Sequence, residues 1–298
     1  MRPPGASRAR TLAGAGLATL AALVLAACGS QSTSQRPAVA RYIRSAQTIE
    51  NALSAPLAAV TRAGAQLASA PHRTTLLGNL ERAGNEQVLA TSLHSLKLAQ
   101  ARLVALHTPP AARHLRSLLL TLTAAEADQT HQLRLLAVFL PRFSAALAPL
   151  GPATISLERV LTQTQAYGTA AVAALYTAKA QALRHFQGVT TGIVTRLHRL
   201  HRLHPPRVSM PQYRAELGSL TGMSSASGRL AGALAGGTPG NVTTLLVAFD
   251  RAAASTRSRS AQRAQIAAIK AYDAGAARLN RLSSAVAVER LRLANTLT

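Results

Sequence analysis

Residues 111–147 of this 298-residue chain read AARHLRSLLLTLTAAEADQTHQLRLLAVFLPRFSAAL. Its large apolar residues recur mostly at intervals of three or four, which places their side chains on one face of an α-helix. The spacing predicts a helix from about Ala111 that Pro141 bends and that Pro149, Gly151 and Pro152 end. The residues expected to face inward are Leu115, Leu119, Leu122, Leu133, Leu136, Leu140, Phe143 and Leu147.

Similar spacing of apolar residues continues along the rest of the chain. It predicts further helical segments at about 37–69, 76–107, 157–203, 211–235 and 239–293, with a kink at Pro56 and a break near 256–260. Leucine and alanine are abundant, aromatic residues make up 3% and tryptophan is absent, a composition that favours helices over strands. Because short Pro- and Gly-containing turns separate the segments, the sequence predicts an all-α fold, an elongated antiparallel bundle of about six helices.

Two Pro-Pro turns recur in similar surroundings, LHTPP at 106–110 and LHPP at 203–206. Each precedes an arginine and two leucines with the same internal spacing: Arg116, Leu119 and Leu122 after the first turn, and Arg214, Leu217 and Leu220 after the second. A duplication would explain this repetition and would divide the body into similar halves, 37–150 and 151–298. Pro-Pro stops that recur between unrelated helices would explain it equally well.

The N-terminal segment has the features of a secretory signal. Arg2, Arg8 and Arg10 precede an uncharged apolar run over 12–27, and the run ends in Leu25-Ala26-Ala27-Cys28. This tetrapeptide resembles the lipobox of bacterial lipoprotein precursors, and Cys28 is the only cysteine in the chain. The resemblance implies that residues 1–27 are removed, that Cys28 carries the lipid (palmitate among its acyl chains), and that 28–36 form a flexible tether.

A chain of this family is expected at the cell membrane, anchored on the extracytoplasmic face; whether in an inner or an outer membrane stays open. No segment after Cys28 is expected to span the bilayer. Only three of the 33 basic residues are lysine, a bias that resembles the codon usage of a GC-rich bacterium. The body resembles the helical lipoproteins of such bacteria.

The chain is strongly basic, with a formal charge of +23. Removal of Arg2, Arg8 and Arg10 with the signal would leave about +20. Such a body attracts phosphate-bearing partners. Outside the cell these are lipid head groups or anionic envelope polymers rather than nucleic acid. The oligomeric state stays open.

The most unusual local feature is RLHRLHRLH at 196–204, three copies of Arg-Leu-His. In a helix the leucines would face inward, with histidines on one flank and arginines on the other. No Asp or Glu occurs between Glu158 and Glu216, so this end of the bundle is expected to carry uncompensated positive charge. The candidate anion-binding residues are therefore Arg196, Arg199, Arg202, His198, His201 and His204. The alternatives are a solvated helix end, whose cations complement the helix dipole, and metal capture by the histidines.

The motifs of common enzyme classes are absent from the sequence. It contains no Gly-x-Ser-x-Gly, no His-Glu-x-x-His, no Gly-Lys-Ser/Thr phosphate loop and no Glu-x-x-His pair of a di-iron bundle. We therefore predict no catalytic residue, no cofactor and no metal ion, but a binding or structural module at the cell envelope. The alternative is a metal-binding or sensing accessory lipoprotein. It would need the scattered histidines to converge: His72, His94, His107, His114, His131 and His185.

Overall fold

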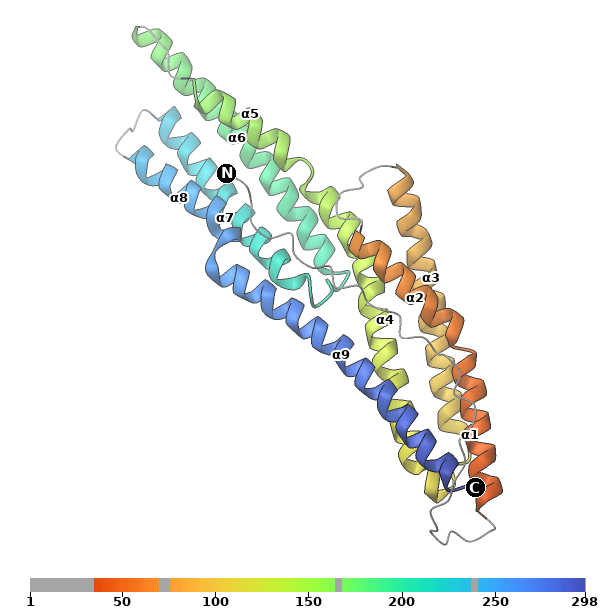
Figure 1. Ribbon diagram of the computed structural model, residues 1–298. Helices are drawn as coiled ribbons and strands as arrows, with labels where there is room; N and C mark the ends of the chain where they lie inside the picture. Colours follow the sequence, from red (N-terminus) through yellow and green to blue (C-terminus); the bar gives the residue numbers. More distant parts are fainter. Residues whose placement is uncertain (1–34, 70–75, 164–167, 237–240, 298) are drawn as a thin grey trace.

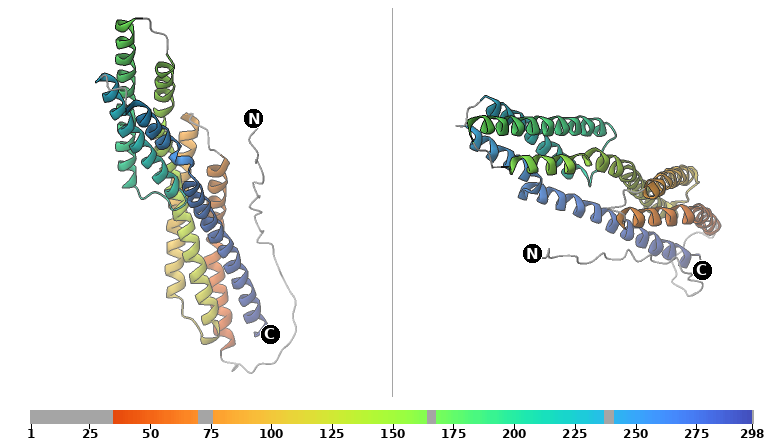
Figure 2. Two further views of the ribbon diagram at one scale, coloured as in Figure 1. Left: turned by 90° about the vertical axis from the view of Figure 1, so that its left-hand side faces the viewer. Right: turned by 90° about the horizontal axis from the view of Figure 1, so that it is seen from above.

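Helices account for nearly every described residue, as the leucine- and alanine-rich composition predicts. The computed structural model describes residues 35–69, 76–163, 168–236 and 241–297. Within those ranges it has no strand, which confirms the all-α helical bundle (Figures 1 and 2). The α-helices are α1 (Arg36–Asn51), α2 (Ser54–Ser69), α3 (Leu76–Ala105), α4 (Arg113–Leu147), α5 (Leu150–Leu161), α6 (Thr169–His201), α7 (Met210–Ala235), α8 (Val242–Ala254) and α9 (Arg259–Asn295). The short 3-10 helices η1 (Pro110–Ala112) and η3 (Ser255–Arg257) precede α4 and α9.

Three of the six predicted segments are each divided into two helices. The first becomes α1 and α2, because Pro56 lacks the N–H that a helix continuing from α1 would need. The last is divided by η3, where the break was predicted. The segment at 157–203 becomes α5 and α6, but α5 begins earlier, at Leu150, so that Gly151 and Pro152 lie in its first turn. Gly168 precedes α6 with a φ of 89°, a conformation that glycine adopts without strain. Pro141 lies inside α4, which continues to Leu147.

The largest groups of buried apolar side chains form two clusters, and α4 contributes to both. The first cluster joins α1, α3, the start of α4 and the end of α9, through residues that include Val39, Tyr42, Leu103, Leu115, Leu119, Val286 and Leu293. The second joins the end of α4 to α5, α6 and α7, through residues that include Phe139, Phe143, Leu157, Phe186, Ile193, Leu197 and Leu220. The two clusters therefore do not coincide with the segments 37–150 and 151–298. The helix α4, from the first segment, contributes to the second cluster, and α9, from the second segment, contributes to the first.

The molecule is elongated; α4 runs lengthwise through it, and α9 runs along one edge from its middle to one end (Figures 1 and 2). The helix α1 begins at the end of the molecule where α9 ends, while the start of α6, the end of α7 and the start of α8 lie toward the opposite end (Figure 1). An anchor that precedes α1 would therefore hold the body by one end.

The two Pro-Pro turns occupy equivalent places, because each joins a closely packed antiparallel pair, α3 with α4 and α6 with α7. The leucines that follow the turns are not buried in register. Leu119 is fully buried but its counterpart Leu217 only partly so, and Leu220 is fully buried but its counterpart Leu122 only partly so. The hairpins are thus alike in topology and differ in which face of the second helix is buried.

One helical stretch contradicts the expectation that no later segment is apolar enough to span a membrane. The continuous run Pro110–Leu161, which contains α4 and α5, meets that criterion by length and composition, and 28% of its most apolar window is buried. In the bundle this run packs against α3, α6 and α9. A central core helix of a soluble bundle meets the same criterion.

Several leucines and isoleucines predicted to face inward are exposed instead. On α4, Leu140 is 39% exposed, and the neighbouring Phe139 is buried in its place. On α9, Ile266 and Ile269 are 53% and 44% exposed, because no other described helix covers that side of α9. The residues of α9 buried in the described bundle are Val286, Glu289 and Leu293, all near its C-terminal end.

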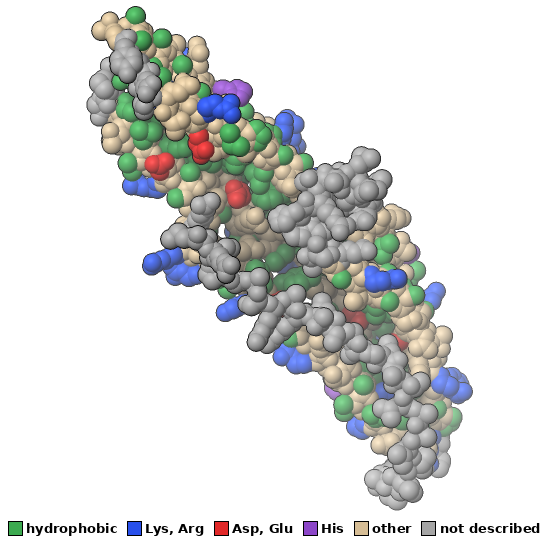
Figure 3. All heavy atoms as spheres, turned by 45° about the horizontal axis from the view of Figure 1, so that its top comes forward, with side chains coloured by type: hydrophobic (Ala, Val, Ile, Leu, Met, Phe, Trp, Pro, Cys, Tyr) green, Lys and Arg blue, Asp and Glu red, His purple; other side chains and the backbone are tan. Residues whose placement is uncertain are grey.

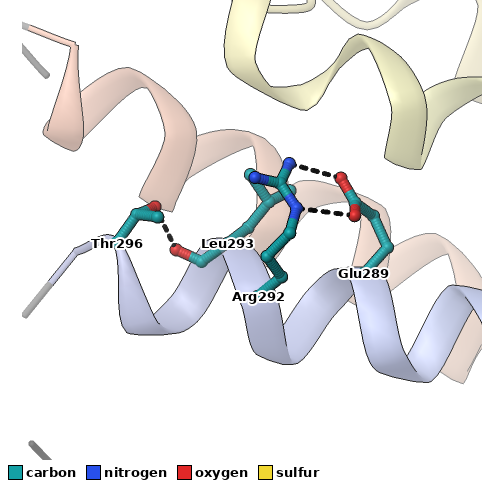
Figure 4. A network of polar contacts seen from close by, with 4 residues as sticks. All are labelled: Glu289, Arg292, Leu293 and Thr296. Atoms are coloured by element: carbon teal, nitrogen blue, oxygen red, sulfur yellow. Dashed lines mark hydrogen bonds and ion pairs between the residues drawn. The ribbon is translucent and has the colours of Figure 1, made fainter. Parts of the chain in front are cut away.

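A polar contact accompanies the burial of that end of α9. Arg292 donates two hydrogen bonds to the buried carboxylate of Glu289, at 2.8 and 2.6 Å, and Thr296 donates to the carbonyl of Leu293 (Figure 4). These hydrogen bonds from Arg292 lower the pKa of Glu289, so the carboxylate remains charged and paired although it is buried. The residue after Glu289, Arg290, forms an ion pair with Glu50, which ties α9 to α1.

Candidate anion-binding face

The first two Arg-Leu-His triplets lie on α6 in the predicted orientation. Leu197 and Leu200 are buried against the second cluster. Arg196, Arg199, His198 and His201 are exposed on the two flanks. The leucines point inward because they are the only apolar residues of the triplets, and the longer basic side chains reach water.

The third triplet does not continue the helix, contrary to the prediction. The helix α6 ends at His201, Leu203 is 36% exposed, and His204 has a φ of 54°. Pro205 is the cause, because the residue before a proline is disfavoured in the helical conformation. Arg202 and His204 therefore lie in the turn beyond α6 rather than on its stripes.

Tyr213 of α7 fixes the end of α6, a role that the sequence did not reveal. Its hydroxyl donates a hydrogen bond to the carbonyl of Leu197 at 3.1 Å, and burial raises the pKa of this phenol. The ring of His201 stacks on the Tyr213 ring at 5.7 Å, and Phe139 and Phe143 contact the same tyrosine. One face of the His201 imidazole is therefore covered by Tyr213. The arginine side chains are accordingly the groups of this surface that are more accessible to a ligand.

The tract lies partway along the molecule rather than at one end of the bundle. In the turn after α6, the backbone N–H of Arg207 donates to Gln132 of α4 at 3.3 Å. The carbonyl of Val208 accepts a hydrogen bond from Gln265 of α9, also at 3.3 Å. The turn is thus held between the two long helices α4 and α9.

Arg196 also lines a groove that extends the basic surface along α6. The groove has a volume of about 350 Å³, and α6 contributes most of its lining: Arg184, His185, Gly188, Val189, Gly192, Ile193 and Arg196. A Cβ atom at Gly188 or Gly192 would meet no atom within 4 Å, so the floor between the two arginines is open. We call the exposed side chains of Arg184, His185, Arg196, His198 and Arg199 the α6 basic face. The sequence analysis named His185 only as a histidine for metal binding and did not name Arg184, although Arg184, Gly188, Gly192 and Arg196 follow one another at intervals of four.

No described carboxylate neutralises the arginines of this face. The ion pairs of the described residues involve Arg134, Arg290 and Arg292 instead. The only acidic residue of α7, Glu216, has its pKa raised by burial, which favours its neutral form. Lys and Arg side chains are nevertheless spread along the whole face of the molecule in Figure 3, so the α6 basic face adds to a generally basic surface.

The alternative function, metal binding, finds no candidate site among the described residues. Among them, no group of three or more His, Cys, Asp or Glu side chains lies close enough to hold a metal ion. His72 and Cys28 lie outside the described residues.

Comparison with known proteins adds no relative from which a function could be transferred. No family model matches the chain, and neither the curated proteins nor the solved structures contain a significant match. The functional argument therefore depends on the residues of this chain alone.

Proposed function

We propose that the chain is a lipid-anchored, extracytoplasmic binding protein whose α6 basic face binds a phosphate-bearing polymer of the cell envelope. The observation that carries the proposal is the row of exposed, unpaired arginines on α6, next to an open groove. Guanidinium groups suit this ligand, because they form paired, charge-assisted hydrogen bonds with phosphate oxygens.

The position of α6 in the body favours a polymer over lipid head groups. Arg113 begins α4 beside the start of α1, and Gln132, which contacts the turn after α6, lies 19 residues further along α4. At a rise of about 1.5 Å per residue, that turn is about 29 Å from the anchored end, and α6 continues away from it. Surface charges are screened over about 8 Å at physiological salt, so an upright body cannot reach head groups with this face.

The proposal can be tested with the full chain reconstituted in neutral phosphatidylcholine vesicles. Soluble polyphosphate serves as the probe polymer and is captured when the vesicles are sedimented. We expect a variant with Arg184, Arg196 and Arg199 changed to Gln to capture it at least about tenfold less at 0.1 M salt, and 1 M salt to abolish capture by the parent.

The matched control changes three exposed arginines near the anchored end, Arg41, Arg44 and Arg102, to Gln. This variant loses the same charge, and we expect it to capture polyphosphate like the parent. Equal capture by all three proteins would show that the α6 basic face is only a solvated helix surface. Anionic vesicles are added as a competitor for polyphosphate. If they displace polyphosphate from the parent, and if only the control variant fails to bind these vesicles, lipid head groups rather than a polymer are the partner.

A further inference from the structure

A second groove lies on the far side of α7 from α6, at the corner where α7, α8 and the start of α9 meet. Its volume is about 690 Å³, within the range of small-molecule sites. Figure 1 shows α8 turning through η3 into α9 beside α7, which forms this corner. The lining residues that matter for its chemistry are Arg214 and Gly218 of α7, Arg251 of α8, and Ser255, Ser258 and Ser260.

Glycine and alanine residues make the floor of this groove open and apolar. A Cβ at Gly222 would lie 2.9 Å from the Cβ of Ala252, so this glycine permits the close approach of α7 and α8. One turn earlier, a Cβ at Gly218 would meet nothing within 4 Å, because Gly218 faces the open groove. Alanines from all three helices complete the floor, among them Ala215, Ala248 and Ala264.

The rim of the groove is positively charged and carries hydroxyl groups. Arg214 and Arg251 come from different helices, both are exposed, and neither side chain makes a hydrogen bond or ion pair with a described residue. The Ser258 hydroxyl accepts from the N–H of Ala261 at 3.2 Å and lies 3.1 Å from the hydroxyl of Ser260. No carboxylate is among the lining residues.

We propose that this groove is a binding site for an organic phosphate. The Ser255 hydroxyl donates to the carbonyl of Ala252 at 2.7 Å, so the donors for the oxygens of one phosphate are two unpaired guanidinium groups and the Ser258–Ser260 hydroxyl pair. The glycine and alanine floor matches the carbon body attached to that phosphate. Inorganic phosphate would use the rim alone and an alcohol the floor alone, so each should bind more weakly than the ester. The site is separate from the α6 basic face and does not rest on the function proposed for that face.

The ligand could be a free phosphate ester or the head group of a phospholipid, which share this chemistry. The experiment titrates the full chain, held in neutral phosphatidylcholine nanodiscs, with hexyl phosphate, hexanol, inorganic phosphate and short-chain phosphatidylglycerol, followed by calorimetry. We expect hexyl phosphate to bind at least about tenfold more tightly than inorganic phosphate, and hexanol not to bind. Tighter binding of the phosphatidylglycerol than of hexyl phosphate would assign the site to a phospholipid, and the reverse order to a free ester.

Three variants locate the binding in the groove. Arg214→Gln and Arg251→Gln should each weaken hexyl phosphate binding at least about tenfold, because each removes a charge-assisted contact. Gly218→Leu should abolish binding by filling the groove, and helicity measured by circular dichroism should be retained, since leucine is the better helix former. The control Arg229→Gln removes an exposed charge elsewhere on α7 and should bind like the parent. If Arg229→Gln weakens binding as much as Arg214→Gln, or if Gly218→Leu binds normally, the groove is not the site.

Discussion

Glu126 is the side chain whose ionisation the fold alters most clearly. It lies on α4, where burial and, to a smaller extent, the negative charge of Glu50 together raise the pKa of its carboxyl to about 7. Glu50 is itself paired with Arg290 of α9, so that cation is already engaged by another carboxylate. The bundle therefore favours the neutral form of Glu126.

This shift predicts how stability depends on pH. Between the ordinary pKa of 4.5 and the folded value of about 7, the folded state binds more protons than the unfolded state. The free energy of unfolding must then fall as the pH rises through that window. Glu126→Gln removes this loss, and we expect the variant to be more stable than the parent by about 1–3 kcal/mol near pH 8, the two becoming equal below about pH 4.5.

Urea unfolding followed by circular dichroism at the two pH values measures the difference. A variant that is equally stable or less stable near pH 8 would show that Glu126 is adequately solvated or paired in the bundle.

At the same scale, the sequence predicts some features of the basic tract and not others. The triplet period alone is enough to place Leu197 and Leu200 inward and their basic neighbours outward. The predicted segment 157–203 also ends before Pro205, although three triplets on one helix would have included His204. The sequence could not predict that His201 stacks on Tyr213, because the stacking depends on the pairing of α6 with α7. The raised pKa of Glu126 could not be predicted for the same reason, since the burial of its carboxyl is a property of the assembled helices.

The helix α9 is buried by its neighbours over only part of its length. Its apolar spacing predicted a continuous inward face, but its buried residues all lie in its C-terminal part. Periodicity shows which side of a helix is apolar, and it does not show whether another helix covers that side. For the same reason, periodicity placed Leu140 of α4 inward although the adjacent Phe139 is the buried residue. The two residues lie near the edge of the buried face.

The uneven packing of α9 predicts unequal effects of truncation along it. Leu293 is fully buried in the first cluster, so Leu293→Ala should lower the free energy of unfolding by about 2–5 kcal/mol. Ile266→Ala makes a similar truncation at a position that is 53% exposed, and should cost less than about 1 kcal/mol. Thermal or urea unfolding of the two variants gives the comparison. A large loss for Ile266→Ala would mean that a partner covers this side of α9 in solution.

For the whole molecule, the all-α class and the approximate number of helical segments could be predicted from apolar spacing and proline positions. The distribution of the core could not, because hydrophobic contacts between α9 and α1 join residues more than 200 positions apart. These contacts bring the start and the end of the body to the same end of the molecule. A lipid at Cys28 would then act on the whole molecule, since it would hold the first cluster near the membrane and the second cluster and α6 away from it.

Attachment through Cys28 is therefore the central claim, and the lipid on the mature chain is its most direct test. The chain is expressed in a bacterial host that processes lipoproteins and is labelled with an alkyne fatty acid. Its membrane fraction is then analysed by intact mass spectrometry. We expect a labelled chain that begins at Cys28 with a diacylglycerol thioether, and an unlabelled Cys28→Ser variant that retains residues 1–27, because a hydroxyl cannot replace the thiol in that bond. Equal labelling of the two proteins, or a mature chain that begins elsewhere without lipid, would contradict the account.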